Sequence, residues 1–247
     1  VPADPPRGKR GMFGKKMIAS AYLAKQIQAF LDERNAEGLL AYLQRLSNAA
    51  RRSADTLLGE SLLVEIEEEA FWLFFSEMVR RTPKAYLGTF LKAAGVRLAK
   101  GQLNVADPLF LKFAAEDATP IDRTKCLDAL LPLIKQPEDA ERVLDAFFCK
   151  EPKTAPGRAL ALLKVPTDAC NYLLFKTMKQ TDNLVLVRKV CLRLLQRGGG
   201  ASFNLAGILA GYFGIQSLPA AFSLKIEPYQ YSHLEESYGN FLKYLRQ

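Results

Sequence analysis

Apolar residues recur every three or four positions along most of the chain, which is the spacing of one face of an α-helix. No clean alternation of apolar and polar residues, flanked by hairpin turns, indicates strands. The sequence therefore predicts an all-α chain. The helices expected in its first part are residues 17–34, a run through Leu39, Leu43, Leu46 and Ala50, a long helix over 54–81, and a helix from Thr82-Pro83 to Lys100-Gly101.

The central stretch carries three prolines, Pro108, Pro137 and Pro166, at a spacing of 29 residues. Each follows the first residue of a block, and proline is tolerated at the first position of a helix because its missing N–H would be unpaired there. Each block then breaks and continues into a second helix. The aligned apolar positions are Leu111, Ala140 and Ala169; Ala114, Val143 and Tyr172; Ala115, Leu144 and Leu173; Leu133, Leu162 and Cys191; and Ile134, Leu163 and Leu192.

This register predicts a helical-repeat, α-solenoid-like array of antiparallel helix pairs. One helix pair cannot bury its own apolar face, so neighbouring pairs stack and share a core. No consensus of the tetratricopeptide, HEAT or armadillo repeats is present, and the period is shorter than theirs. The alternative is an irregular helical domain in which the register arises by chance.

Composition changes along the chain indicate three regions. Residues 1–16 are rich in Pro, Gly, Lys and Arg and predict a flexible basic tail. Residues 17–101 form an N-terminal helical subdomain, and residues 102–247 form the repeat region. In that region an uncharged stretch, 198–224, predicts a buried helix over 203–215 rather than a membrane span, and an amphipathic helix from Leu234 is expected to cap the end.

The chain is basic, with 34 Lys and Arg against 26 Asp and Glu and a formal charge of +8. In the last repeat helix, Lys189, Arg193 and Arg197 recur every four residues and Arg188 lies beside them. Lys135 and Lys164 occupy the block position of Arg193. The six residues predict a basic column for a polyanion or another partner. The alternative is a set of cations favoured near helix C-termini by the helix dipole.

Residues with the types and spacing of a catalytic or metal site are scarce. His233 is the only histidine, and Cys126, Cys149, Cys170 and Cys191 lie far apart, which indicates buried thiols rather than zinc ligands or disulfides. Glu65, Glu68 and Glu69 share a helix face without the histidine of a di-metal motif, and indicate a solvated acidic face. Gly198-Gly199-Gly200 lacks the phosphate-loop pattern and predicts a turn. We expect no catalytic residue, cofactor or metal.

The hypothesis that follows is a non-catalytic helical-repeat scaffold that binds another macromolecule within an assembly. A protein partner comes first, and nucleic acid bound by the basic column and the N-terminal arm is the alternative. A third reading is a helical-repeat enzyme that resembles the HEAT-like DNA glycosylases in architecture and charge only. No membrane partner is expected. Cysteine usage indicates a reducing, cytoplasmic location, while an organellar location after cleavage of a targeting segment and the oligomeric state stay open.

Overall fold

The computed structural model describes residues 10–151 and 155–215, with side chains from residue 20 onward. In these residues all regular secondary structure is helical, which confirms the all-α prediction. The chain divides into two compact units, an N-terminal unit of residues 1–117 and a C-terminal unit of residues 118–247. The predicted tail up to residue 9 and the predicted final helix from Leu234 lie outside the described residues.

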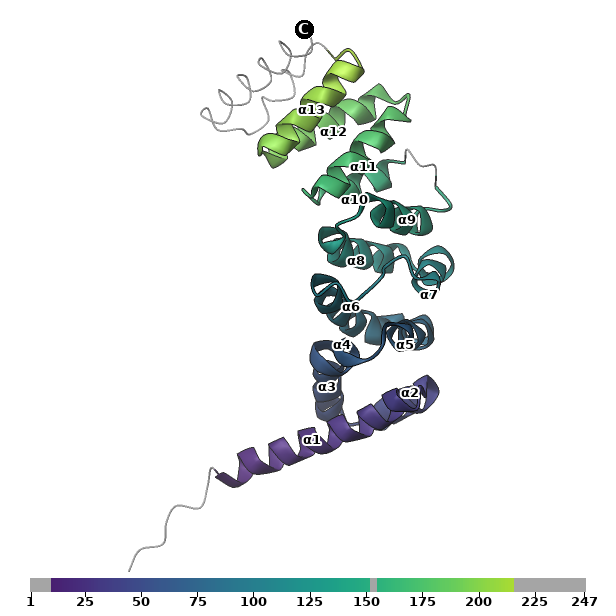
Figure 1. The fold of residues 1–247 in the computed structure, drawn as a ribbon, viewed down its shortest axis with the longest axis vertical. Helices are drawn as coiled ribbons and strands as arrows, with labels where there is room; N and C mark the ends of the chain where they lie inside the picture. Colours follow the sequence, from purple (N-terminus) through teal and green to yellow (C-terminus); the bar gives the residue numbers. More distant parts are fainter. Residues whose placement is uncertain (1–9, 152–154, 216–247) are drawn as a thin grey trace, which may run out of the picture. The chain divides into compact units, whose positions relative to one another are not determined.

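The N-terminal unit is built from successive helices that pack on near neighbours in the sequence (Figure 1). α2 packs on α5 and α5 on α7, while α3 and the π-helical turn η1 pack on α6. Through these contacts the helices bury apolar side chains against one another. The elements are α1 (Arg10–Asp32), α2 (Ala36–Arg45), α3 (Asn48–Leu57), η1 (Leu58–Leu62), α4 (Leu63–Glu65), α5 (Glu68–Arg81), α6 (Pro83–Ala99), α7 (Pro108–Lys112) and the π-helical turn η2 (Phe113–Asp117).

An aromatic cluster forms the core of this unit. Trp72 and Phe75 on α5 are buried, and their ring centroids lie 5.1 and 5.6 Å from that of Phe110 on α7. Phe113 in η2 meets Phe75 edge-to-face at 5.1 Å. Such edge-to-face contacts add to the free energy gained by burial. Because α7 and η2 are held in this cluster, the first unit ends after Asp117, whereas the sequence placed a boundary at Gly101.

The predicted long helix over 54–81 is wrong. Ser47 accepts a hydrogen bond from the Ala50 N–H and starts α3 there, so α3 begins before the predicted start at residue 54. The chain then leaves helical geometry at Ile66 and Glu67, whose ψ angles are 163° and 150°, before α5 begins.

A buried arginine explains this break. The Arg97 side chain is 3% exposed, and its Nη1 lies 3.1, 3.0 and 2.6 Å from the carbonyl oxygens of Leu63, Val64 and Ile66. These are carbonyls that the end of α4 leaves without a helical partner. The guanidinium supplies that partner, so the break is a tertiary interaction that no local pattern shows.

α1 begins at Arg10, so residues 10–16 are helical and not part of a flexible tail as predicted. The nearest upstream proline is Pro6, and the glycines at 11 and 14 lower helix propensity without preventing helix formation. By contrast, α6 spans the predicted range, although the Thr82 hydroxyl donates to the Met78 carbonyl instead of capping α6.

The described residues of the C-terminal unit, 118–151 and 155–215, form two series of helices that contact one another in turn. α8 packs on α10 and α10 on α12, while α9 packs on α11 and α11 on α13. α12 and α13 form the most extensive pair, joined through Gly198 and Gly199 at φ values of +76° and +84°. The elements are α8 (Pro120–Leu130), the 3₁₀ turn η3 (Leu131–Leu133), α9 (Pro137–Phe147), α10 (Pro156–Leu163), α11 (Asp168–Lys179), α12 (Leu184–Arg197) and α13 (Gly200–Tyr212).

The exact 29-residue register is not kept. Pro108 and Pro137 are the first residues of α7 and α9, but α11 begins at Asp168, after a Thr167 cap, so Pro166 lies outside the helix. α9, α11 and α13 begin 31 and 32 residues apart, and α8, α10 and α12 begin 36 and 28 residues apart. Tyr172, predicted on a core face, is 56% exposed.

α13 agrees with the predicted buried helix over 203–215, since Leu205, Ala206, Gly207, Leu209 and Ala210 are buried on it. No helix among the described residues combines the length and apolarity needed to cross a membrane. The turn at Gly198 and Gly199 is a helix connection, in line with the predicted turn.

Candidate binding groove between α10 and α12

Two neighbouring helices of the C-terminal unit form a groove. α10 starts with Pro156 at its first position, and α12 starts after Asn183, whose side chain accepts from the Leu186 N–H at 3.0 Å. α12 ends at Arg197, and the next residue, Gly198, has a φ of +76°, which glycine adopts without steric cost. These local signals set the start of α10 and both ends of α12, and the two helices pack on each other.

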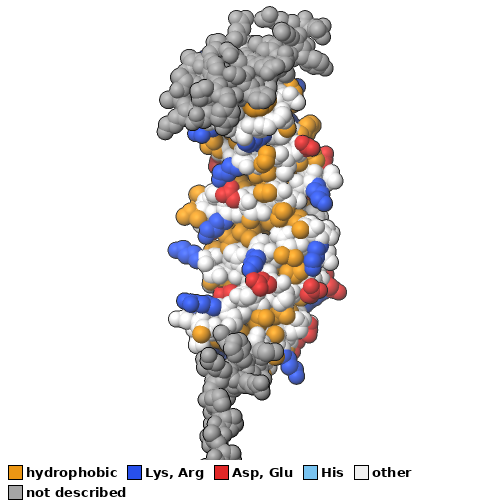
Figure 2. All heavy atoms as spheres, turned by 90° about the vertical axis from the view of Figure 1, so that its left-hand side faces the viewer, with side chains coloured by type: hydrophobic (Ala, Val, Ile, Leu, Met, Phe, Trp, Pro, Cys, Tyr) orange, Lys and Arg blue, Asp and Glu red, His pale blue; other side chains and the backbone are white. Residues whose placement is uncertain are grey.

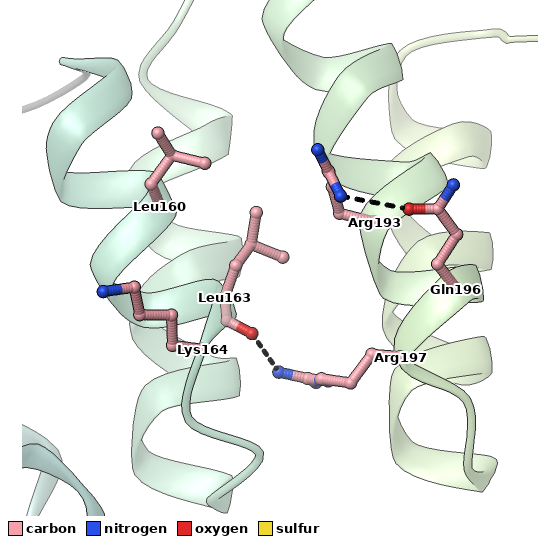
Figure 3. Close-up of a pocket in the computed structure, with 6 residues that line it drawn as sticks. All are labelled: Leu160, Leu163, Lys164, Arg193, Gln196 and Arg197. Carbon is pink, nitrogen blue, oxygen red and sulfur yellow. Dashed lines mark hydrogen bonds between the residues drawn. The ribbon is translucent and has the colours of Figure 1, made fainter. Parts of the chain in front are cut away.

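The groove has a volume of about 500 Å³ and combines aliphatic and cationic side chains (Figure 3). Leu160 and Leu163 come from α10, with Lys164 just after it, and Arg193, Gln196 and Arg197 come from α12. Three of the six predicted partner-binding residues are thus brought together. None of the six lining side chains is a carboxylate, a thiol or an imidazole.

Arg197 crosses from α12 to α10 and is half-buried. Its guanidinium donates to the Leu163 carbonyl oxygen at 3.1 Å, to Asn171 Oδ1 at 2.7 Å and to Ser202 Oγ at 2.9 Å. All three acceptors are uncharged, so none of them neutralises the positive charge. Removal from water lowers the pKa of Arg197, which is the expected effect of burying a cation.

Arg193 and Lys164 differ in how their charges are compensated. Arg193 is exposed, and the partner of its guanidinium is the neutral side-chain oxygen of Gln196, at 3.4 Å. The Lys164 ammonium points away from α12 and forms an ion pair of 2.9 Å with Asp128 on α8 (Figure 3). The positive charge that faces the groove therefore comes from the two arginines.

The other three predicted residues lie outside the groove lining. Arg188 and Lys189 are exposed on α12, and Lys135 is exposed between η3 and α9. In the described part of the chain none of the three forms an ion pair. The face drawn in Figure 2 shows separate Lys and Arg side chains, with hydrophobic and some acidic side chains between them.

The sequence did not indicate Leu160 and Gln196 as groove residues. Leu163, which the sequence predicted on a core face, is buried at 9% exposure and also borders the groove. Leu160 is 44% exposed, although it stands in an apolar helix. The available signal was that α10 carries leucines on more than one face, at 160, 162 and 163, which one buried face does not require. Gln196 carries no such signal.

The other candidates for chemistry have structural roles or solvent contacts. Of the three candidate carboxylates, Glu65 is exposed, Glu69 pairs with Arg34 at 3.6 Å, and Glu68 accepts from the Asn104 N–H. Cys126, Cys170 and Cys191 are buried and Cys149 is exposed, with no disulfide among them. No group of three or more His, Cys, Asp or Glu side chains suited to a metal ion occurs within residues 10–151 and 155–215.

Comparison of the chain with protein-family models, with curated proteins and with solved structures finds no match, so the groove is interpreted from its own geometry and charge.

Proposed function

We propose that this chain is a helical-repeat adaptor that binds another macromolecule within an assembly, and that it does so at the groove between α10 and α12. The observation that carries the proposal is the pair of arginines, Arg193 and Arg197, that face the groove and whose partners within residues 10–151 and 155–215 are all uncharged. Arginines with spare donors and uncompensated charge are suited to binding anionic groups.

The packing order of the C-terminal unit supports the repeat part of this proposal. Alternate helices contact one another in two series, as stacked helix pairs do. Such pairs present grooves between successive helices of one series, and the α10–α12 groove has this position.

The residue types that line the groove also favour binding over catalysis. Arginine stays protonated in proteins, so it binds anions but does not take up a proton as a general base would. The aliphatic side chains of Leu160 and Leu163 add apolar contact area. A groove of this kind supports recognition rather than proton transfer.

Site-specific photocrosslinking tests the proposal. A photoreactive amino acid in place of Gln196 or of Leu160 is expected to give one discrete adduct in an extract of the source cells. The same amino acid in place of Arg142, which is exposed on α9, serves as the control. Adducts that are equal at all three positions, or absent at both groove positions, would contradict a binding site in this groove.

The second candidate function is nucleic-acid binding, favoured by exposed Arg188 and Lys189 on the same helix as Arg193. Labelled single- and double-stranded nucleic acid in a salt series tests it, with and without residues 1–16. Affinity that falls steeply with salt and depends on Arg188 and Lys189 supports this candidate. Affinity that disappears with residues 1–16 places the binding at the N-terminus of the chain and not on α12.

A further inference from the structure

The Arg197 guanidinium is held in a fixed position before any partner binds. Its three hydrogen bonds hold the guanidinium across the groove, so little side-chain entropy is left to lose on binding. A half-buried cation whose hydrogen-bond acceptors are all neutral lowers the stability of the fold. A carboxylate bound beside it would recover part of that free energy. Elsewhere in this unit the buried Arg158 is neutralised by Asp145 at 2.7 Å. Arg197 lacks the equivalent acid within the described chain.

The side chains that line the groove indicate which kind of anion it binds. Leu160 and Leu163 supply aliphatic surface beside the arginines, and the lining contains no aromatic side chain. Single-stranded nucleic acids gain much of their affinity by stacking bases on aromatic rings, and their phosphates follow rows of cations. Here Lys164, the third cation, is already paired with Asp128. The lining fits acidic and aliphatic groups side by side.

From these contacts we infer that the α10–α12 groove binds a protein segment in which a Glu or Asp side chain meets Arg193 and Arg197 and neighbouring aliphatic side chains lie on Leu160 and Leu163. The inference rests on the proposed function, because it names the chemistry of the partner bound at the same groove. Arg193 forms the adaptable contact, since it is exposed, and Arg197 forms the fixed one.

The test uses fluorescein-labelled peptides and the full chain, with anisotropy as the readout. One peptide of about 15 residues, or about four helical turns, places Leu and Glu on one face. A second peptide replaces every Glu by Gln, and an oligonucleotide of similar charge is the third probe. We expect saturable binding of the Glu peptide and about tenfold weaker binding of the Gln peptide, as loss of a charge-assisted hydrogen bond predicts.

Variants locate the binding. Arg193→Glu is expected to weaken the Glu peptide about tenfold or more, and Leu160→Asn by several-fold, because these remove the charge and the apolar contact respectively. Arg142→Glu, an exposed charge reversal on α9, is the matched control and is expected to leave the affinity within about twofold. Thermal unfolding of each variant checks that the fold is kept. Arg197→Lys keeps the charge but loses the hydrogen-bond geometry, and is expected to give an intermediate affinity.

Three results would overturn the inference: no saturable binding of the Glu peptide, equal affinity for the Glu and Gln peptides, or an oligonucleotide that binds more tightly than the Glu peptide and depends on Arg193. If photocrosslinking at Gln196 captures a macromolecule while the peptides do not bind, the proposed function is supported and the inference of an acidic and aliphatic partner is wrong. If crosslinking also gives no adduct, both the proposed function and the inference are wrong.

Discussion

The guanidinium of Arg197 donates to the carbonyl oxygen of Leu163 and so links the C-terminus of α12 to that of α10. Arg97 makes the same kind of link in the N-terminal unit, from α6 to the carbonyls at the end of α4. In both units an arginine near a helix C-terminus satisfies carbonyls that the preceding helix in its series leaves unpaired. The two arginines differ in exposure, since Arg97 is buried and Arg197 borders the groove.

Replacing Arg97 by methionine is expected to lower the free energy of unfolding of the N-terminal unit by about 2–4 kcal/mol. The variant leaves several buried carbonyls without a donor, and that penalty exceeds the apolar gain of the methionine. Urea unfolding followed by fluorescence measures the effect, because Trp72 is the only tryptophan and lies in this unit. Lys100→Met, an exposed neighbour, should change stability by less than about 0.5 kcal/mol. A stability loss equal to that control would show that the carbonyls find other partners.

Removing Asp145 alone should lower the free energy of unfolding more than removing both Arg158 and Asp145. The Arg158 side chain is 4% exposed and that of Asp145 is 42% exposed, so Asp145→Ala leaves a buried cation without its counter-ion. We expect a loss of about 1–3 kcal/mol, reduced by the exposure of the acid. The double variant with Arg158→Met should recover part of it. Unfolding followed by circular dichroism, which reports the helices of both units, measures the loss, and a double variant less stable than Asp145→Ala contradicts the expectation.

Truncating Phe75 tests the aromatic cluster. Phe75 contacts Trp72, Phe90, Phe110 and Phe113, so Phe75→Ala leaves a cavity and is expected to cost about 3–5 kcal/mol. Phe30→Ala removes a half-buried ring and should cost clearly less. The emission of Trp72 gives the unfolding midpoint of both. Equal losses would mean that the cluster relaxes around the missing ring.

The four thiols are expected to react in two classes. Burial raises the pKa of Cys126 and Cys170, and raises that of Cys191 to about 12, so these thiols stay protonated and unreactive at pH 8. A thiol reagent should therefore label Cys149 in the native protein and all four in denaturant. Rapid labelling of a second thiol in the native state would contradict the burial of these residues.

The same burial gives a pH dependence of stability. An ordinary thiol has a pKa near 9.0, and that of Cys191 is raised to about 12 in the folded protein. Its contribution is therefore full below pH 9 and is lost between pH 9 and 12, because the unfolded chain ionises first. The Cys191→Ala variant should show a weaker fall in melting temperature across this range.

Local signals in the sequence indicate where helices begin, but they do not show where a predicted long helix is interrupted. Thr119 and Thr167 cap their helices, and such a cap can be recognised in the sequence because it involves only the next three residues. The break at Ile66 depends on Arg97, some thirty residues away, and no periodicity contains that information. Likewise, the spacing of Arg193 and Arg197 placed both on one helix face, but only the packing of α10 beside α12 adds Leu160 to them and separates them from Lys135.

The way the helices contact one another has a consequence for how the chain folds. Most of the principal contacts join α-helices that are one or two helices apart, such as α9 with α11 and α10 with α12, and α2 with α5 and α3 with α6 are three helices apart. Short separations keep the entropy of loop closure small, which favours rapid folding. During synthesis each helix can pack soon after the next one to three have left the ribosome. The N-terminal helices can therefore reach their native contacts while the residues of the groove are still being translated.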